Sequence, residues 1–204
     1  MMDRLLSRSL FHFKIIVEEQ FIMMTWLPHV LLLFVLPTWL IYGISRFLFY
    51  RKYKLRIMIE LTILGYITYF IILFYVVWMT PTLLLEYLPI NLIPFKTIFQ
   101  YFVEVSTGTL AFSTAFINIA GNILLTVPIG FLIYIIYRRV SFNKLLLIAL
   151  MFPLVIETGQ LVLHLVDIST RTIDIDDLIL NALGIVIGYY LLYLIQLFIK
   201  VKNT

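Results

Sequence analysis

Long apolar runs alternate with short polar segments along most of this chain. A transmembrane helix needs about 20 mainly apolar residues, or roughly 17–25 when tilt is allowed for, and five stretches meet this requirement. They cover residues 21–43, 57–80, 116–137, 145–166 and 178–199. The pattern predicts an all-α, polytopic membrane bundle with five transmembrane helices. Pro28, Pro37 and Pro128 predict kinks in the first and third of these helices.

Two other segments have amphipathic patterns. Residues 1–20 mix acids and bases with apolar pairs, which predicts a segment at the membrane surface. Between the second and third runs, Pro94 is placed to open a further helix. One face of that helix carries Phe95, Ile98, Phe99 and Phe102, and the opposite face carries Lys96, Gln100 and Glu104. Two placements fit: the helix lies flat at the outer leaflet, or it packs on the bundle through its Phe face.

The composition agrees with a membrane protein and excludes other classes. Of the 204 residues, 63% are hydrophobic and 13% are charged, whereas soluble domains have roughly 45–50% and ~25%. The mean hydropathy is +1.06. The absence of cysteine excludes a disulfide scaffold, a zinc–thiolate site and an iron–sulfur cluster, and we expect no cofactor and no metal site. The net charge of +4 does not indicate nucleic acid, because the bases lie between apolar runs.

Basic residues predict the orientation in the membrane. Ten of them follow the first, third and fifth runs: Arg46, Arg51, Lys52, Lys54, Arg56, Arg138, Arg139, Lys144, Lys200 and Lys202. Only Lys96 and Arg171 lie in the intervening segments of the other side. Cytoplasmic segments carry an excess of Lys and Arg, so we expect a multi-pass protein whose C-terminus is cytoplasmic and whose surroundings are the lipid bilayer.

Polar residues gather at a similar depth on three predicted helices. They are Asn118 and Asn122 on the third helix, Glu157, Gln160 and His164 on the fourth, and Arg171, Asp174, Asp177 and Asn181 at the start of the fifth. At a rise of ~1.5 Å per residue, Glu157 lies about 18 Å into a core roughly 30 Å thick. Polar groups are costly in hydrocarbon. The arrangement therefore predicts a shared polar cavity in the outer half of the membrane.

Some of these residues also have a purely structural interpretation. The two asparagines of the third helix would hydrogen-bond neighbouring helices, and Gly184 and Gly188 would let helices pack closely. Asp176 is expected to be a solvated loop acid or a charge at a helix N-terminus. Glu157 is different, because a carboxylate at that depth must be neutral, paired or hydrated. Arg171 is its expected cation, and a structural ion pair is the alternative.

Several runs, taken in order, resemble the VanZ-like family of bacterial membrane proteins. They are Asn91-Leu-Ile-Pro-Phe95, Asn118-Ile-Ala-Gly-Asn122 with Pro128 and Gly130, Glu157-x-x-Gln160, and Arg171-x-x-Asp174-x-x-Asp177-x-x-x-Asn181-x-x-Gly184-x-x-x-Gly188. The resemblance covers about residues 60–195. It implies a VanZ-like membrane domain over residues 57–199 in a bacterial plasma membrane, with 1–20 and 21–43 outside it.

The resemblance also implies a set of candidate site residues and a biological setting. The motif positions are Asn118, Asn122, Glu157, Gln160, Arg171, Asp174, Asp177 and Asn181. The founding member of the family is associated with resistance to the lipoglycopeptide teicoplanin, and no reaction is firmly established for the family.

Three functions fit these observations. In the first, which we favour, the polar cavity binds an amphiphile such as a lipid-linked cell-wall precursor or the lipoglycopeptide antibiotic. In the second, the chain is an intramembrane enzyme in which Glu157, Asp174 and Asp177 divide general acid and base roles. In the third, an intramembrane carboxylate with an Arg partner serves a transporter or proton-coupled channel.

Overall fold

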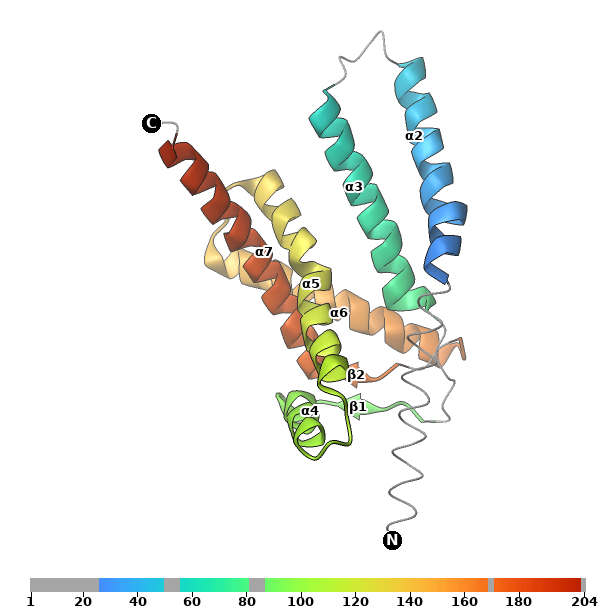
Figure 1. Cartoon of the computed structure of the whole chain (residues 1–204), viewed down its shortest axis with the longest axis vertical. Coiled ribbons are helices and arrows are strands. Elements are labelled where there is room, and N and C mark those ends of the chain that lie inside the picture. Colours follow the sequence, from blue (N-terminus) through green and yellow to red (C-terminus); the bar gives the residue numbers. More distant parts are fainter. Residues whose placement is uncertain (1–25, 50–55, 81–86, 169–170, 203–204) are drawn as a thin grey trace. The chain divides into compact units, whose positions relative to one another are not determined.

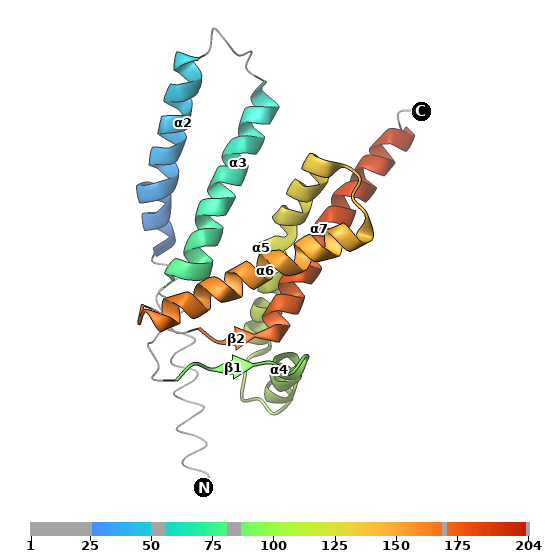
Figure 2. The same cartoon turned by 180° about the vertical axis from the view of Figure 1, so that it is seen from behind.

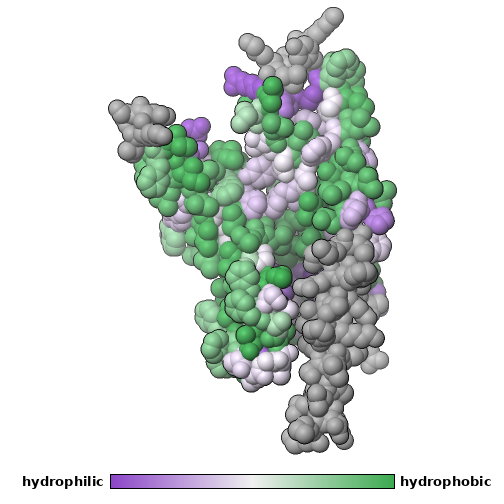
Figure 3. Space-filling model, viewed as in Figure 1, coloured by the Kyte–Doolittle hydropathy of each residue, from purple (hydrophilic) through white to green (hydrophobic). Residues whose placement is uncertain are grey.

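The structure is a computed structural model that describes residues 26–49, 56–80, 87–168 and 171–202. Within these residues, five helices are long and apolar enough to cross a membrane, which confirms the all-α polytopic class. They are Trp26–Leu48, Ile57–Met79, Phe112–Tyr137, Phe142–Leu165 and Ile175–Lys200. Hydrophobic residues cover most of their visible surface (Figure 3). The expected surface segment, residues 1–20, and the first part of the predicted span 21–43 lie outside the described residues.

Helix ends differ from the predicted spans for local chemical reasons. The first membrane helix continues past Gly43 to Leu48, because a lone glycine costs a helix interior only about 1 kcal/mol and apolar residues follow it. The last helix begins at Ile175, before the predicted residue 178. There the Asp174 carboxylate accepts a hydrogen bond of 2.9 Å from the backbone N–H of Asp176, which caps the first turn.

The helices fall into two compact units, Met1–Thr82 and Leu83–Thr204. The described part of the first unit holds η1 (Leu31–Val35), α2 (Leu36–Leu48), α3 (Ile57–Phe74) and η2 (Tyr75–Met79). Its two continuous helices are joined by polar side chains: Trp39 Nε1 donates to Thr68 Oγ1 at 2.9 Å, and Glu60 accepts from Tyr42 and Arg46. This unit contributes none of the candidate site residues.

The second unit contains every candidate site residue. Its elements are β1 (Ile90–Asn91), α4 (Lys96–Ser106), α5 (Phe112–Tyr137), α6 (Phe142–Leu165), β2 (Ile173–Asp174) and α7 (Ile175–Lys202). The two short strands pair in parallel, with Asn91 opposite Asp174. Figures 1 and 2 show α4, β1 and β2 together where α5 and α7 begin, and we call this region the strand end of the unit. The sequence pattern did not predict the strand pair.

Glycines allow α5 and α7 to pack backbone to backbone. A Cβ atom on Gly184 would lie 2.1 Å from the carbonyl oxygen of Ile123, and one on Gly188 would lie 2.1 Å from that of Val127. Gly130 on α5 approaches α7 just as closely. Small residues at helix interfaces permit such approaches in membranes. The contact brings the polar first turns of α7 against the polar face of α5.

The helix expected near Pro94 is α4, which begins at Lys96. The side chains of Phe95, Phe99 and Phe102 are 61%, 65% and 72% exposed. These exposures contradict the placement in which the Phe face packs on the bundle. The less exposed residues of α4 are instead Thr97, Ile98, Tyr101 and Val105, which share another face at helical spacing. Ile98 therefore belongs to the packed face and not to the Phe face.

Candidate functional site

Asp174 ties the two strands and α4 together. Its Oδ1 accepts a hydrogen bond from Asn91 Nδ2 at 2.9 Å, and its Oδ2 accepts one from Thr97 Oγ1 at 2.5 Å. The same Oδ1 also caps α7 through the N–H of Asp176. Asp174 is only 4% exposed. Because neutral donors already occupy both of its oxygens, this carboxylate has a structural role.

Asp176 holds the N-terminus of α4. Its carboxylate accepts hydrogen bonds from the backbone N–H groups of Phe95 at 2.5 Å, Thr97 at 2.8 Å and Ile98 at 3.3 Å. The first N–H groups of a helix have no partner within the helix, and a carboxylate satisfies them with a favourable charge. Asp176 is 1% exposed, so the expectation of a solvated loop acid is wrong. The alternative expectation, a charge at a helix N-terminus, describes it better.

Asp177 faces α5 instead. Its Oδ1 accepts a 2.5 Å hydrogen bond from Asn122 Nδ2. One turn further on, Thr126 Oγ1 donates to the backbone carbonyl of Asn181 at 2.7 Å. These two contacts continue the glycine contact between α5 and α7 toward the strand end. They place Asn122 in the cluster by direct hydrogen bonding.

Glu157 of α6 completes the cluster from a third helix. It is 7% exposed. Its carboxylate accepts a hydrogen bond from the backbone N–H of Asp174 and interacts electrostatically with Asp177 and Arg171. Its Oε2 atom is buried without a hydrogen-bond partner among the described residues, and so is the Oδ1 atom of Asn181. Within the described residues, the site therefore contains two buried acceptor atoms that receive no hydrogen bond.

The remaining predicted residues lie around this cluster. Arg171 is part-buried and interacts electrostatically with both Glu157 and Asp177. Gln160 is part-buried on α6. Asn118 lies one turn before Asn122 and is exposed, unlike the buried members of the cluster. Gly184 and Gly188 lie in the α5–α7 contact.

Four residues of this region are absent from the predicted set: Asn91, Thr97, Tyr101 and Asp176. Asn91 stands in a motif run, but only the strand pairing shows that it reaches Asp174. Burial, and after it the negative charges of Asp177 and Asp174, raises the pKa of Tyr101 to about 12. The Tyr101 phenol therefore stays protonated and keeps its hydrogen-bond donor. The spacing of Thr97, Tyr101 and Val105 on α4 is the signal that identifies this face.

The carboxylates of the cluster are arranged as hydrogen-bond acceptors and not as the ligands of a metal site. Among the residues that the structure describes, no group of three or more His, Asp or Glu side chains is arranged to hold a metal ion. Asp174 and Asp176 are occupied by neutral donors within the protein. Glu157 keeps one carboxylate oxygen without a hydrogen-bond partner among the described residues, and Asp177 and Arg171 are the charged groups that interact with it.

The fold and the site define a multi-pass helical membrane protein with a polar cluster at one end of a glycine-packed helix pair. The family model for VanZ/LLP1 matches residues 61–196, which is more than half of the chain. The chain belongs to this family, as the motif resemblance predicts. Neither the comparison with curated proteins nor the comparison with solved structures finds a match.

Proposed function

We propose that the cluster around Glu157 and Asp177 binds the polar head of an amphiphile. The observation that carries this proposal is that Glu157 Oε2 and Asn181 Oδ1 are buried without hydrogen-bond partners in the described part of the chain. Buried polar atoms of folded proteins nearly always have partners, and an unmade hydrogen bond costs about 1–3 kcal/mol. A ligand that donates hydrogen bonds, such as an ammonium group or a sugar hydroxyl, would satisfy both atoms.

The charges of the site favour the same chemistry. Glu157 and Asp177 face one nearby guanidinium, that of Arg171. A surplus of negative charge in a low-dielectric region is costly unless a cation or hydrogen-bond donors compensate it. A head group with amines or mixed charge therefore suits the cluster better than a bare polyphosphate.

The depth of the cluster suits an amphiphile. Asn122 and Glu157 each lie fifteen residues from the basic end of their helices, α5 and α6, which is about 22 Å along each helix axis, compared with a core roughly 30 Å thick. The bases Arg138, Arg139 and Lys144 favour a cytoplasmic location for that end. The proposal thus puts the cluster in the outer half of a bacterial plasma membrane, with the C-terminus in the cytoplasm.

Lipid-linked cell-wall precursors and lipoglycopeptide antibiotics are amphiphiles that reach this depth. Membership of the VanZ/LLP1 family supports a connection to teicoplanin resistance or to another function of the cell envelope. In this proposal, the chain binds such a molecule at the outer leaflet and thereby alters the encounter between antibiotic and wall precursor.

Antibiotic susceptibility of a bacterial host tests the proposed role. We expect the wild-type chain to raise the inhibitory concentration of teicoplanin and Glu157→Gln to abolish the increase. Glu104→Gln is the matched control, because it makes the same change on an exposed residue of α4 and should retain the increase. Immunoblots of the membrane fraction must show equal amounts of all three proteins. Full protection by Glu157→Gln would contradict the proposal.

An intramembrane enzyme acting on a lipid-linked cell-wall substrate is the second candidate function. The electrostatic interaction between Glu157 and Asp177 favours it, because two coupled carboxyl groups can divide general acid and base roles. Asp174 fits this role less well, since both of its oxygens are engaged within the protein. Turnover of a purified lipid-linked precursor that both Glu157→Gln and Asp177→Asn abolish would favour the enzyme.

A further inference from the structure

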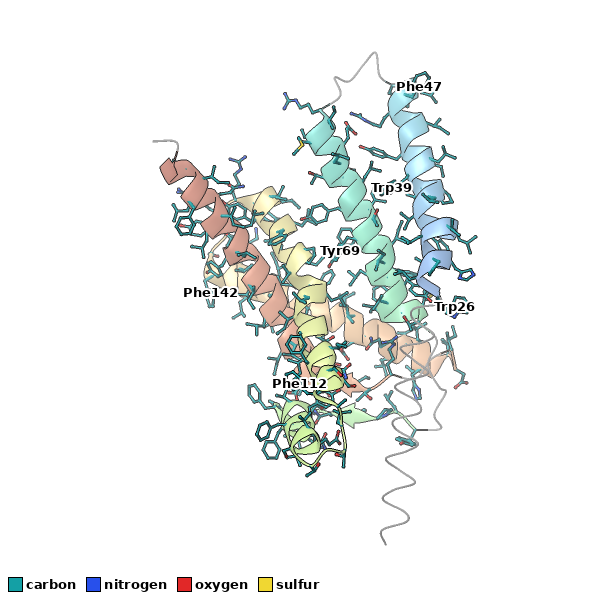
Figure 4. The ribbon with its side chains drawn as sticks, in the orientation of Figure 1. Trp26, Trp39, Phe47, Tyr69, Phe112 and Phe142 are labelled. Carbon is teal, nitrogen blue, oxygen red and sulfur yellow. The ribbon has the colours of Figure 1, made fainter. Side chains whose placement is uncertain are left out.

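Five phenylalanines form an exposed aromatic surface at the strand end. Phe95 immediately precedes α4, and Phe99 and Phe102 lie on it. Phe112 and Phe116 lie in the first turns of α5, where Phe112 is beside α4 (Figure 4). The first three are 61–72% exposed, and Phe112 and Phe116 are 70% and 58% exposed. The rings of Phe112 and Phe116 stack with their centroids 6.0 Å apart. Large contiguous apolar surfaces of this kind mark contact with a membrane or a partner.

The attachment of α4 determines the level at which this surface lies. Asp176, in the first turn of α7, holds the N-terminus of α4 through backbone N–H groups. The C-terminal end of α4 leads through residues 107–111 into α5. The helix therefore lies where two membrane-spanning helices begin, which is the level of the membrane boundary.

The polar residues of α4 lie on a different side of the helix from the phenylalanines. Lys96, Gln100 and Glu104 are exposed and follow one another at intervals of one turn. The third face, which contains Thr97 and Tyr101, is the least exposed and packs toward the protein. A helix with one packed, one polar and one aromatic face is typical of helices that lie in the plane of a membrane surface.

We propose that the aromatic surface docks into the lipid bilayer, with α4 lying in the plane of the interface. Lipid is the occupant that the depth of α4 and the continuity with the apolar surface of α5 both favour. A second copy of the chain could also cover the phenylalanines, but that copy would have to present a complementary apolar surface at the membrane boundary, where α4 lies. The proposal is independent of head-group binding, since the aromatic face of α4 is not the face that contacts Asp174 through Thr97.

Site-directed spin labelling tests this docking directly. The natural chain has no cysteine, so single labels need no altered background. Phe99→Cys, Phe102→Cys and Ser106→Cys place labels on the aromatic face, and Gln100→Cys and Glu104→Cys place them on the polar face. Ser106→Cys is the least disruptive variant, because the two side chains have nearly the same size and Ser106 is exposed. Each labelled protein is reconstituted in phosphatidylglycerol–phosphatidylethanolamine vesicles.

The readout is the accessibility of each label to oxygen, which concentrates in lipid, relative to a water-soluble nickel chelate. We expect this ratio to be several-fold higher at positions 99, 102 and 106 than at positions 100 and 104. Higher access to the nickel chelate at the aromatic positions would show a face in water and would overturn the proposal. Protection from both reagents would show a protein covering and would overturn it as well. The three positions must agree, so one misfolded variant cannot decide the outcome.

Discussion

Replacing Asp176 by Asn tests whether one carboxylate holds α4 at the strand end. Asp176 Oδ1 accepts from the N–H of Phe95, and its Oδ2 accepts from those of Thr97 and Ile98. An asparagine of the same shape keeps one acceptor oxygen and presents an NH₂ group in place of the other. At least one backbone N–H of α4 therefore faces a donor, in a position where the parent side chain is 1% exposed.

The magnitude follows from the hydrogen bonds that are lost. A hydrogen bond to a charged group contributes about 1.5–3 kcal/mol, and a buried donor left without a partner adds a penalty of similar size. We expect Asp176→Asn to weaken the docking of α4 by about 3 kcal/mol. Because 1.4 kcal/mol corresponds to a factor of ten, protection of the α4 amides should fall roughly a hundredfold. The membrane helices should keep most of their protection.

Hydrogen exchange followed by mass spectrometry, on peptides that cover residues 96–106, measures this change in detergent micelles. Asp167→Asn is the matched control, since it removes the same charge from an exposed residue with a φ of 56° that Asn also tolerates. Unchanged exchange in α4 after Asp176→Asn would refute the reasoning. An equal rise in exchange after Asp167→Asn would refute it too, because the effect would then be one of net charge.

Two further predictions concern the helix packing near the site and the burial of Tyr101. Gly188→Ala puts a methyl group 2.1 Å from the carbonyl oxygen of Val127. Thermal unfolding should therefore show that the free energy of unfolding falls by about 1–3 kcal/mol. Gly121→Ala, with no neighbour within 4 Å, should show none. Because the pKa of Tyr101 is raised to about 12 from about 10, stability should fall as pH rises between these values. Tyr101→Phe should remove part of that fall, and an identical fall would contradict the burial of this phenol.

Hydropathy was sufficient to predict the five membrane helices, because the solvent for most of their length is lipid and length alone decides which runs can cross it. The ends of the helices depend on individual side chains instead. The early start of α7 comes from the cap that Asp174 provides, and an aspartate before an apolar run does not by itself show which N–H it will accept. At Gly43 the predicted span ends, but the helix continues past this residue, so a glycine alone does not mark a helix end.

The site was only partly predictable for a related reason. Spacing correctly indicates which residues share a face of one helix, as it does for Asp177 and Asn181, but it does not show which neighbouring helix they meet. Asn118 and Asn122 share a face of α5, yet only Asn122 reaches Asp177. Asp176 points to α4 rather than to solvent because the strand pair brings residues 90–98 beside the start of α7. Each strand has only two residues, which is too short to produce a recognisable pattern in the sequence.

Retention of a bound amphiphile by the purified protein is the most direct test of the central claim. Native mass spectrometry of the wild-type chain, released from nanodiscs that contain a lipid-linked cell-wall precursor, should show a one-to-one complex that survives removal of bulk lipid. Glu157→Gln should lose most of that complex, whereas Glu104→Gln should retain it. Equal retention by all three proteins, or by none of them, would contradict an amphiphile site at Glu157.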